Sequence, residues 1–158
     1  MFVPQDFSSE TDAFCEVLRI GGLAAALDFL NERTGYRFTF IYKCEPPFAR
    51  RVLVYDRTSQ YISSRDLVPL SQTFFELMVT EPVFATADGL LDERSCLHPA
   101  RMHFRGFCGI QLRYDDGRLY GWLAHAHPGA MEVPHQETDF LQQVGAPLMQ
   151  VLEPLALP

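Results

Sequence analysis

The stretch that decides the fold is FRGFCGIQLRYDDGRLYGWLAHA, residues 104–126. Two runs rich in aromatic and branched residues flank Asp116-Gly117, a dipeptide that is the strongest short-range signal for a tight β-hairpin. It predicts a two-residue type I′ turn, in which both central residues have positive φ. Such a turn sets the register of the two strands. The predicted cross-strand pairs are Tyr114 with Leu119, Leu112 with Gly121, Ile110 with Leu123, and Cys108 with His125.

The two faces of this hairpin differ in chemistry, because successive side chains of a strand point to opposite sides. One face carries the aliphatic and small side chains of the pairs just given. The other carries aromatic side chains with polar groups between them, namely Phe107, Gln111, Arg113, Tyr120, Trp122 and Ala124. We therefore expect helices to pack on the first face and a ligand to bind over the second.

Composition indicates one globular domain over residues 1–158. Hydrophobic residues make up 47% of the chain and charged residues 21%, which is the balance of an ordinary domain with a sizeable core. The net charge of −7 argues against a nucleic-acid partner, because the phosphate backbone requires a basic surface. The longest basic run is Arg50-Arg51.

Neither a membrane span nor a secretion signal is expected. No apolar run approaches the ~20 residues that a transmembrane helix needs, and the N-terminus lacks a charged region followed by an apolar one. The cysteines are widely spaced and form no Cys-x-x-Cys, so we expect free thiols; they are Cys15, Cys44, Cys96 and Cys108. These features together predict a cytoplasmic protein.

Hydrophobic periodicity and turn residues predict the remaining elements. We expect two N-terminal helices separated at Gly21-Gly22, a short helix over 70–80, a turn of helix over 90–95 and a closing helix over 136–152. Strands are expected over 36–42, 51–55 and 83–87, with a short one near 131–133, and 56–66 is expected to be a loop. Hairpins outnumber crossovers, so the fold class is α+β. The expected sheet has about six mainly antiparallel strands, with the N- and C-terminal helices on one face.

The order of elements and several motifs resemble a GAF domain, a sensor fold of signalling proteins. The resemblance rests on the segment 81–94, in which a strand ends in Asp88, on the hairpin, and on the end of the closing helix, 146–153. Gln111 stands where proline is common in the family. The hairpin positions that fit the pattern are Gly109, Ile110, Leu112, Gly117, Leu119, Gly121 and Leu123.

The resemblance implies a loop-covered pocket on the helix-free face of the sheet, and a non-catalytic domain that senses or regulates by binding a small organic molecule. The chain shows no effector beside it, so we expect a stand-alone sensor, a partner subunit or a family remnant. The family ligands are diverse, so the resemblance does not identify the ligand. The implied ligand-binding residues are Phe40, Tyr42, Phe75, Asp88, Arg94, His98, Arg101, Gln111 and Trp122.

The segment that is expected to cover the pocket is rich in hydrogen-bonding side chains. Asp92-Glu93-Arg94 is followed by His98 and Arg101. Arg94 or Arg101 is suited to hold a carboxylate or phosphate through two parallel hydrogen bonds. The competing interpretation is a solvated loop with local ion pairs.

We predict no metal and no cofactor. His125-x-His127, with Cys108 opposite and His135 nearby, offers too few converging ligands at metal-site spacing. Cys96-Leu97-His98 is loosely similar to the Cys-His of bilin-binding GAF domains, but its spacing departs by one residue.

Two other functions remain open. The chain could be an enzyme similar to free methionine-(R)-sulfoxide reductase, since residues 105–109 (RGFCG) are superficially similar to its Gly-Val-Cys-Gly. That string lies in the hairpin strand, and a second cysteine is not where the family has one. The chain could instead be a ligand-free dimerisation module. GAF domains often pair through terminal helices, and the apolar tail 151–158 suits such a homodimer.

Overall fold

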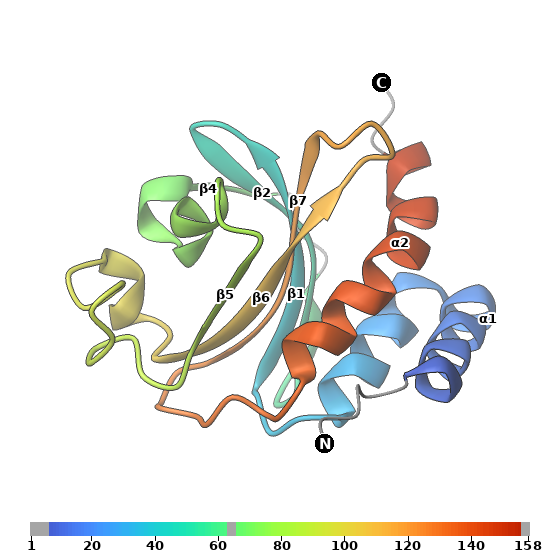
Figure 1. Cartoon of the computed structure of the whole chain (residues 1–158), viewed down its shortest axis with the longest axis horizontal. Helices are drawn as coiled ribbons and strands as arrows, with labels where there is room; N and C mark the ends of the chain where they lie inside the picture. The colour runs from blue at the N-terminus through green and yellow to red at the C-terminus, as the bar shows by residue number, and fades with distance from the viewer. Residues whose placement is uncertain (1–6, 63–65, 156–158) are drawn as a thin grey trace, which may run out of the picture.

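A seven-stranded sheet lies between a helical layer and a layer of short helices and loops in the computed structural model, which describes residues 7–62 and 66–155 (Figure 1). The elements in chain order are α1 (Ser8–Glu32), β1 (Phe38–Glu45), β2 (Phe48–Asp56), β3 (Gln60–Ile62), β4 (Leu67–Pro69), the 3₁₀ helices η1 (Leu70–Gln72) and η2 (Phe74–Met78), β5 (Val83–Thr86), the 3₁₀ helix η3 (Pro99–Met102), β6 (Gly106–Arg113), β7 (Leu119–His127) and α2 (Glu137–Leu155).

The strands run in the order β3-β2-β1-β7-β6-β5, β4 also pairs with β2, and every pairing is antiparallel. Helices α1 and α2 cover one face, and the segments that contain η1, η2 and η3 lie over the other (Figure 1). This confirms the α+β class with the terminal helices on one face. The strand count rises because β3 lies within the predicted loop 56–66 and β4 follows it. The predicted strand at 131–133 is wrong, since this segment is irregular and the Met131 amide donates to the Ala87 carbonyl (2.8 Å).

The central hairpin has the predicted register over most of its length, but its turn differs. Leu112 faces Gly121, and the two predicted pairs beyond it are also present. The turn places only Gly117 at positive φ (89°), and the Tyr114 amide donates to the Arg118 carbonyl. This is the type I turn with a left-handed glycine bulge, in place of the predicted type I′ turn. The predicted Tyr114–Leu119 pair is therefore wrong, because Leu119 pairs with Arg113.

The bulge at this end of the hairpin exchanges the faces of two side chains. Tyr120 is the extra residue between the pairs made by Leu119 and Gly121, and one extra residue reverses the alternation of a strand. Tyr120 consequently packs among the residues under the helices, while Leu119 packs on the opposite face. The sequence-based assignment of Tyr120 to the aromatic face is wrong for this reason.

Two separate apolar clusters form on the two faces of the sheet. The helix-side cluster includes Phe14 and Leu27 of α1, Ile110 of the sheet and Phe140 and Leu148 of α2. The other cluster lies between the sheet and the 3₁₀ helices and is rich in aromatic residues, with Phe40, Phe74, Phe75, Phe84, Phe107 and Trp122 among its members. The aromatic side chains on the hairpin's second face therefore pack in a second core under the loops.

The helices partly follow the predictions. α1 is kinked at Gly22, whose φ of 77° favours glycine, so the predicted break at Gly21-Gly22 is confirmed. The region 70–80 forms two 3₁₀ helices in place of one helix, and 90–95 forms turns, the next helix beginning only at Pro99. Within residues 7–62 and 66–155, no helix combines the length and apolar character needed to cross a membrane.

Candidate ligand-binding site

A pocket of about 240 Å³ lies on the face of the sheet away from α1 and α2. Its floor comes from β1, β2 and β6, and its sides come from β4 and the three 3₁₀ helices. The aromatic lining residues are Phe40, Tyr42, Phe74, Phe75, Phe104 and Phe107, and the polar ones are Arg51, Gln72, Thr73 and His103. Gln72 and His103 are exposed and Arg51 is half-buried, whereas most of the aromatic rings are buried. The pocket therefore has an apolar interior and a polar mouth.

The aromatic wall is held in place by a stack of two rings. Phe75 of η2 stacks on Trp122 of β7 with ring centroids 4.7 Å apart and an interplanar angle of 10°. The Trp122 indole nitrogen donates to the Met78 carbonyl (3.0 Å), and the Gln111 amide donates to the same oxygen (2.8 Å). These two bonds tie η2 to the sheet. The pocket wall is thus built before any ligand arrives, which lowers the entropic cost of binding.

Arg51 reaches the pocket because β2 contains a bulge. Ile41 pairs with Leu53 and Tyr42 pairs with Arg51, so Val52 is an extra residue. Leu53 lies in the helix-side core, and strict alternation would place Arg51 on that same side. The bulge reverses the alternation and puts Arg51 beside Tyr42, where the Arg51 Nε donates to the Tyr42 hydroxyl (3.2 Å).

Of the residues predicted to bind the ligand, Phe40, Tyr42 and Phe75 line the pocket. Trp122 is fully buried behind Phe75, and Gln111 anchors η2 as described above. These two residues shape the wall from behind. The role of all of them in ligand binding stays a prediction.

The polar residues of the covering segment contact other groups of the protein and do not appear among the residues that line the pocket. Arg94 forms an ion pair with Asp92 (2.6 Å) and donates to the Ala85 carbonyl, and the hydrogen bond from Arg94 lowers the pKa of the Asp92 carboxyl. This geometry favours the interpretation of a loop with local ion pairs. The other contacts are Asp88 with Arg105, His98 Nε2 with Glu76 (3.0 Å), and Arg101 with the His98 carbonyl (2.8 Å).

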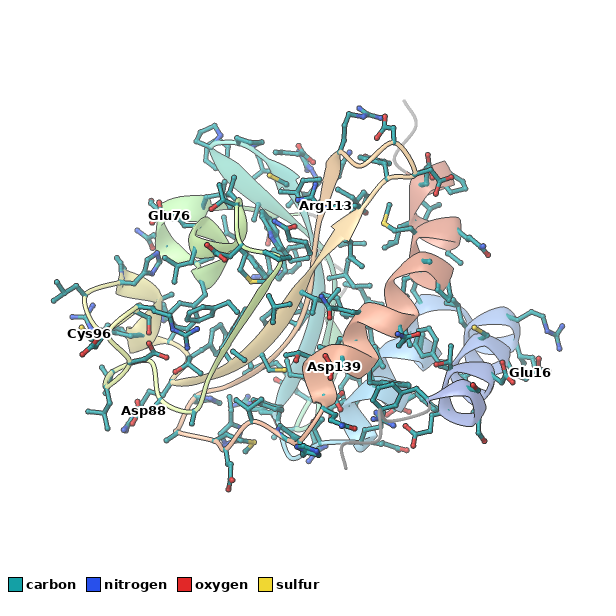
Figure 2. The ribbon with its side chains drawn as sticks, viewed as in Figure 1. Glu16, Glu76, Asp88, Cys96, Arg113 and Asp139 are labelled. Atoms are coloured by element: carbon teal, nitrogen blue, oxygen red, sulfur yellow. The ribbon has the colours of Figure 1, made fainter. Side chains whose placement is uncertain are left out.

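Figure 2 labels side chains that lie on the two opposite sides of the sheet. Glu76, Asp88 and Cys96 come from the segments on the loop side of the sheet, whereas Glu16 and Asp139 belong to α1 and α2. The Cys96 sulfur contacts the Glu93 carbonyl at 3.9 Å, and Cys96 is not among the pocket-lining residues.

The histidines that were weighed as metal ligands bind protein groups. His125 is fully buried on the helix side, between the Thr39 hydroxyl (2.7 Å) and the Glu137 carboxylate (3.1 Å). His127 Nδ1 accepts from the Arg37 amide (3.1 Å). Within the part of the chain that the structure describes, no three His, Cys, Asp or Glu side chains are placed to hold a metal ion.

Cys108 lies on the same buried side. Its thiol is fully inaccessible, and burial, with the nearby Glu137 carboxylate, raises the pKa of the thiol well above its usual range. A thiol in this environment stays protonated at neutral pH and is a poor nucleophile.

Several pocket residues were not predicted, and they differ in how clearly the sequence indicated that they line the pocket. Phe107 was already on the aromatic face of the hairpin, so its sequence signal was present. Phe104 lies two residues before the start of β6. Arg51 carried no usable signal, since simple alternation in β2 places it on the wrong face. Gln72, Thr73 and His103 lie in 3₁₀ helices or beside one, where no regular periodicity shows which side chains point inward.

Neither a protein-family model nor a curated protein matches the sequence. Among solved structures, the GAF domain of an Acinetobacter phosphoenolpyruvate-protein phosphotransferase is similar, with a TM-score of 0.71, 14% identity and 95% of each chain covered. The phycocyanobilin-bound GAF domain of a cyanobacterial phytochrome has a TM-score of 0.68 at 15% identity, over 95% of each chain. The free methionine-R-sulfoxide reductase of Neisseria meningitidis, in complex with its substrate, has a TM-score of 0.62 at 15% identity, over 97% of this chain and 94% of that one. The chain therefore has the fold of a GAF domain.

Proposed function

We propose that this protein is a non-catalytic regulatory domain that senses a small organic molecule in the pocket between the sheet and the 3₁₀ helices. The observation that carries this proposal is the pocket itself: a buried aromatic interior, a wall fixed by the Phe75–Trp122 stack, and polar groups gathered at the mouth. Concave apolar sites with a few convergent polar groups are the usual form of small-molecule sites.

Two of the structurally similar proteins hold a small molecule, since one is phycocyanobilin-bound and the other is in complex with its substrate. At 15% identity each, they share the fold with this chain and not its ligand. They support the proposal by showing that this architecture accommodates small molecules of different kinds. A role in signalling is part of this proposal.

The structure disfavours the enzyme alternative. A sulfoxide reductase of this kind needs an accessible thiolate and a resolving cysteine. Cys108 is fully buried on the helix side of the sheet, away from the pocket, and its pKa is raised by burial. Turnover of free methionine sulfoxide that is lost in Cys108→Ser would restore the enzyme interpretation.

The dimerisation alternative does not compete for the same surface. The terminal helices lie on the opposite side of the sheet from the pocket (Figure 1), so a homodimer through them leaves the pocket open to a ligand. Light scattering of the full chain at increasing protein concentration measures that pairing separately.

The proposal is tested by a thermal-shift screen of the purified protein with aromatic acids, phenols, amino acids, oxo-acids and cyclic nucleotides. A compound at ~100 times its Kd stabilises the native state by about 2.7 kcal/mol, which corresponds to about 5–10 °C in Tm for a chain of this size.

Two substitutions on β4 locate the binding site. Val68→Phe fills the pocket, because Val68 lines it, and should abolish the shift. Leu67→Phe adds the same ring at the exposed neighbouring position and should leave the shift unchanged. A screen without any stabilising compound, or a shift that survives Val68→Phe, would overturn the proposed site.

A further inference from the structure

We propose that the ligand is a small uncharged phenol: a single aromatic ring inside the pocket, with its hydroxyl at the mouth beside Gln72 and His103. This inference rests on the proposed function, since it names the chemical class of ligand for that same pocket. It follows from the size of the cavity, the aromatic character of its walls, the partners that Arg51 already holds and the two polar side chains at the mouth.

The cavity sets the size of the ligand. A dry cavity of about 150 Å³ holds one benzene molecule, or about 25 Å³ for each non-hydrogen atom. At that ratio the pocket, about 240 Å³, holds about ten non-hydrogen atoms, which is enough for phenol with one or two small ring substituents. Drug-sized ligands occupy sites of roughly 300–1,000 Å³. A cyclic nucleotide or a linear tetrapyrrole is too large for this pocket.

The walls favour a flat ring. Phe75 lies 5.2 Å from Tyr42 and 5.9 Å from Phe107 between ring centroids, the latter pair at an interplanar angle of 70°. Phe40 contacts both Phe75 and Tyr42 edge to face. Rings arranged in this way present edges and faces to the cavity, and an aromatic ligand makes the same offset or edge-to-face contacts with them.

The charges at the pocket disfavour an ionic ligand. Arg51 is the permanently charged residue among those that line the pocket, and it is already engaged. Its Nε donates to the Tyr42 hydroxyl (3.2 Å), its guanidinium pairs with Asp66 (3.8 Å), and it has a further interaction. None of the described lining residues is acidic. Because a buried charge without a free partner carries a large desolvation penalty, Arg51 serves as part of the wall and the ligand is uncharged.

Two polar side chains at the mouth suit a ligand hydroxyl. Gln72 ends η1 and His103 follows η3, so they reach the pocket from two segments. Both are exposed, and neither side chain forms a hydrogen bond with another described residue. The Thr73 hydroxyl, by contrast, already donates to the Leu70 carbonyl (3.0 Å).

The chemistry of these two side chains matches a phenol. An amide and a neutral imidazole each offer both a donor and an acceptor, so either can bind a hydroxyl that keeps its proton. A phenol hydroxyl, with an ordinary pKa of about 10, is such a group at neutral pH. The ring then occupies the aromatic interior, and the hydroxyl stays at the polar mouth.

The test compares phenol with three probes of similar size by isothermal titration calorimetry: toluene (no hydroxyl), cyclohexanol (no aromatic ring) and benzoate (an anion). Phenol should bind about threefold or more tightly than toluene. A pocket without partners for the hydroxyl would give the reverse order, since burying an unpaired hydroxyl is costly. Phenol should also bind about three- to tenfold more tightly than cyclohexanol and more than about tenfold more tightly than benzoate.

Substitutions at the mouth locate the hydroxyl. The double variant Gln72→Ala with His103→Ala should lower phenol affinity about three- to tenfold and leave toluene affinity unchanged. The matched control is Gln143→Ala with His135→Ala, which removes the same two side-chain types from exposed positions that do not line the pocket. It should change the affinity of neither compound.

The outcomes separate this inference from the proposed function. Tighter binding of toluene than of phenol, or phenol affinity unchanged in the mouth variant, would reject recognition of a hydroxyl. Benzoate or cyclohexanol binding as tightly as phenol would reject the uncharged aromatic class. In each of these cases the sensor proposal stands if Val68→Phe abolishes the binding that is observed. If Val68→Phe changes the affinity of no ligand, the sensor proposal fails as well.

Discussion

Tyr42 and Arg51 face each other across β1 and β2, and their side chains are joined by a hydrogen bond of 3.2 Å at the mouth of an aromatic pocket. This pairing exists because Val52 is an extra residue in β2. The bulge turns an arginine that alternation assigns to the helix side toward the candidate ligand. Bulges often re-aim a side chain next to a functional site, and here one bulge supplies the cation of the pocket.

Removing the Tyr42 hydroxyl should weaken ligand binding without unfolding the protein. Tyr42→Phe keeps the ring that contacts Phe75 but deletes the acceptor for the Arg51 Nε, so Arg51 loses one of the contacts that orient it. For a compound found in the thermal-shift screen, we expect the affinity to fall about three- to tenfold, the equivalent of one ordinary hydrogen bond of about 0.5–1.5 kcal/mol, with Tm nearly unchanged.

The matched control is Tyr36→Phe, which deletes a buried hydroxyl without a hydrogen-bond partner among the described residues. It should leave binding unchanged and leave the protein as stable or slightly more so. Unchanged ligand affinity in Tyr42→Phe would contradict the orienting role of this hydroxyl.

Truncating Glu137 should destabilise the fold strongly. Its carboxylate and the His125 ring are both almost fully buried, and they join α2 to the sheet through a 3.1 Å contact. Glu137→Ala leaves the His125 Nε2 without this partner, which costs about 1–3 kcal/mol. Urea unfolding measures the loss as a lower midpoint at unchanged m-value.

Asp139→Ala, on the exposed side of the same helical turn, is the control and should cost less than about 1 kcal/mol. Equal midpoints for the two variants would show that the buried pair does not hold α2 on the sheet.

Low pH should reduce the free energy of unfolding, in part because it protonates the Asp56 carboxylate. Hydrogen bonds from Arg37, and further ones from Thr58 and Ser59, lower the pKa of the buried Asp56 carboxyl far below its ordinary value. A depressed folded-state pKa gives stability that is fully present above the unfolded pKa of about 3.9 and is lost as the pH falls toward the folded value.

Asp56→Asn removes this titration. It should lower the free energy of unfolding at pH 7 by about 1–3 kcal/mol and make the decline between pH 4 and pH 2 (roughly the window set by that pKa) shallower. Urea titrations at both ends of this window measure the difference. An equal decline in the free energy of unfolding with pH for wild type and variant would refute the role of this carboxyl.

The same glycine-to-alanine change should have opposite effects at two positions. A Cβ at Gly121 would overlap the Tyr42 carbonyl oxygen on the neighbouring strand, so Gly121→Ala must displace β1 and with it the pocket wall. A Cβ at Gly145 in α2 meets only Leu112 Cδ2, at 3.7 Å, and alanine is the better helix former by about 0.5–1 kcal/mol. Thermal denaturation should show a clear loss of Tm for Gly121→Ala and a gain for Gly145→Ala. The same sign for both would be inconsistent with this packing.

Local patterns carried enough information to predict the sheet, its central hairpin register and the side that the terminal helices cover. Ile110 and Leu123 alternate with Phe107 and Trp122 strongly enough that only one face could be aliphatic. The break at Gly21-Gly22 was visible for the same kind of local reason, since adjacent glycines weaken a helix.

The bulges at Val52 and Tyr120 were not predictable, because each depends on how a partner strand accommodates an extra residue. The bulge at Val52 affects the candidate site most, because it makes Arg51 the cation of the pocket in place of the predicted Arg94 and Arg101. Arg94 and Arg101 were predicted to bind a ligand anion, but nearby groups already bind them. Asp92 lies two residues from Arg94, and the His98 carbonyl lies three residues from Arg101. Short-range partners of this kind engage a side chain before any ligand can.

The most direct test is an NMR titration of the ¹⁵N-labelled protein with a compound that stabilises it in the thermal-shift screen. We predict saturable shifts of amide resonances confined to the pocket, in β1 around Phe40 and Tyr42, in β2 around Arg51 and in η2 around Phe75, with α1 and α2 unaffected. Absence of saturable shifts, or shifts centred on the groove between β6 and α2 near Gln111 and Gly145, would contradict the assignment of this pocket as the ligand site.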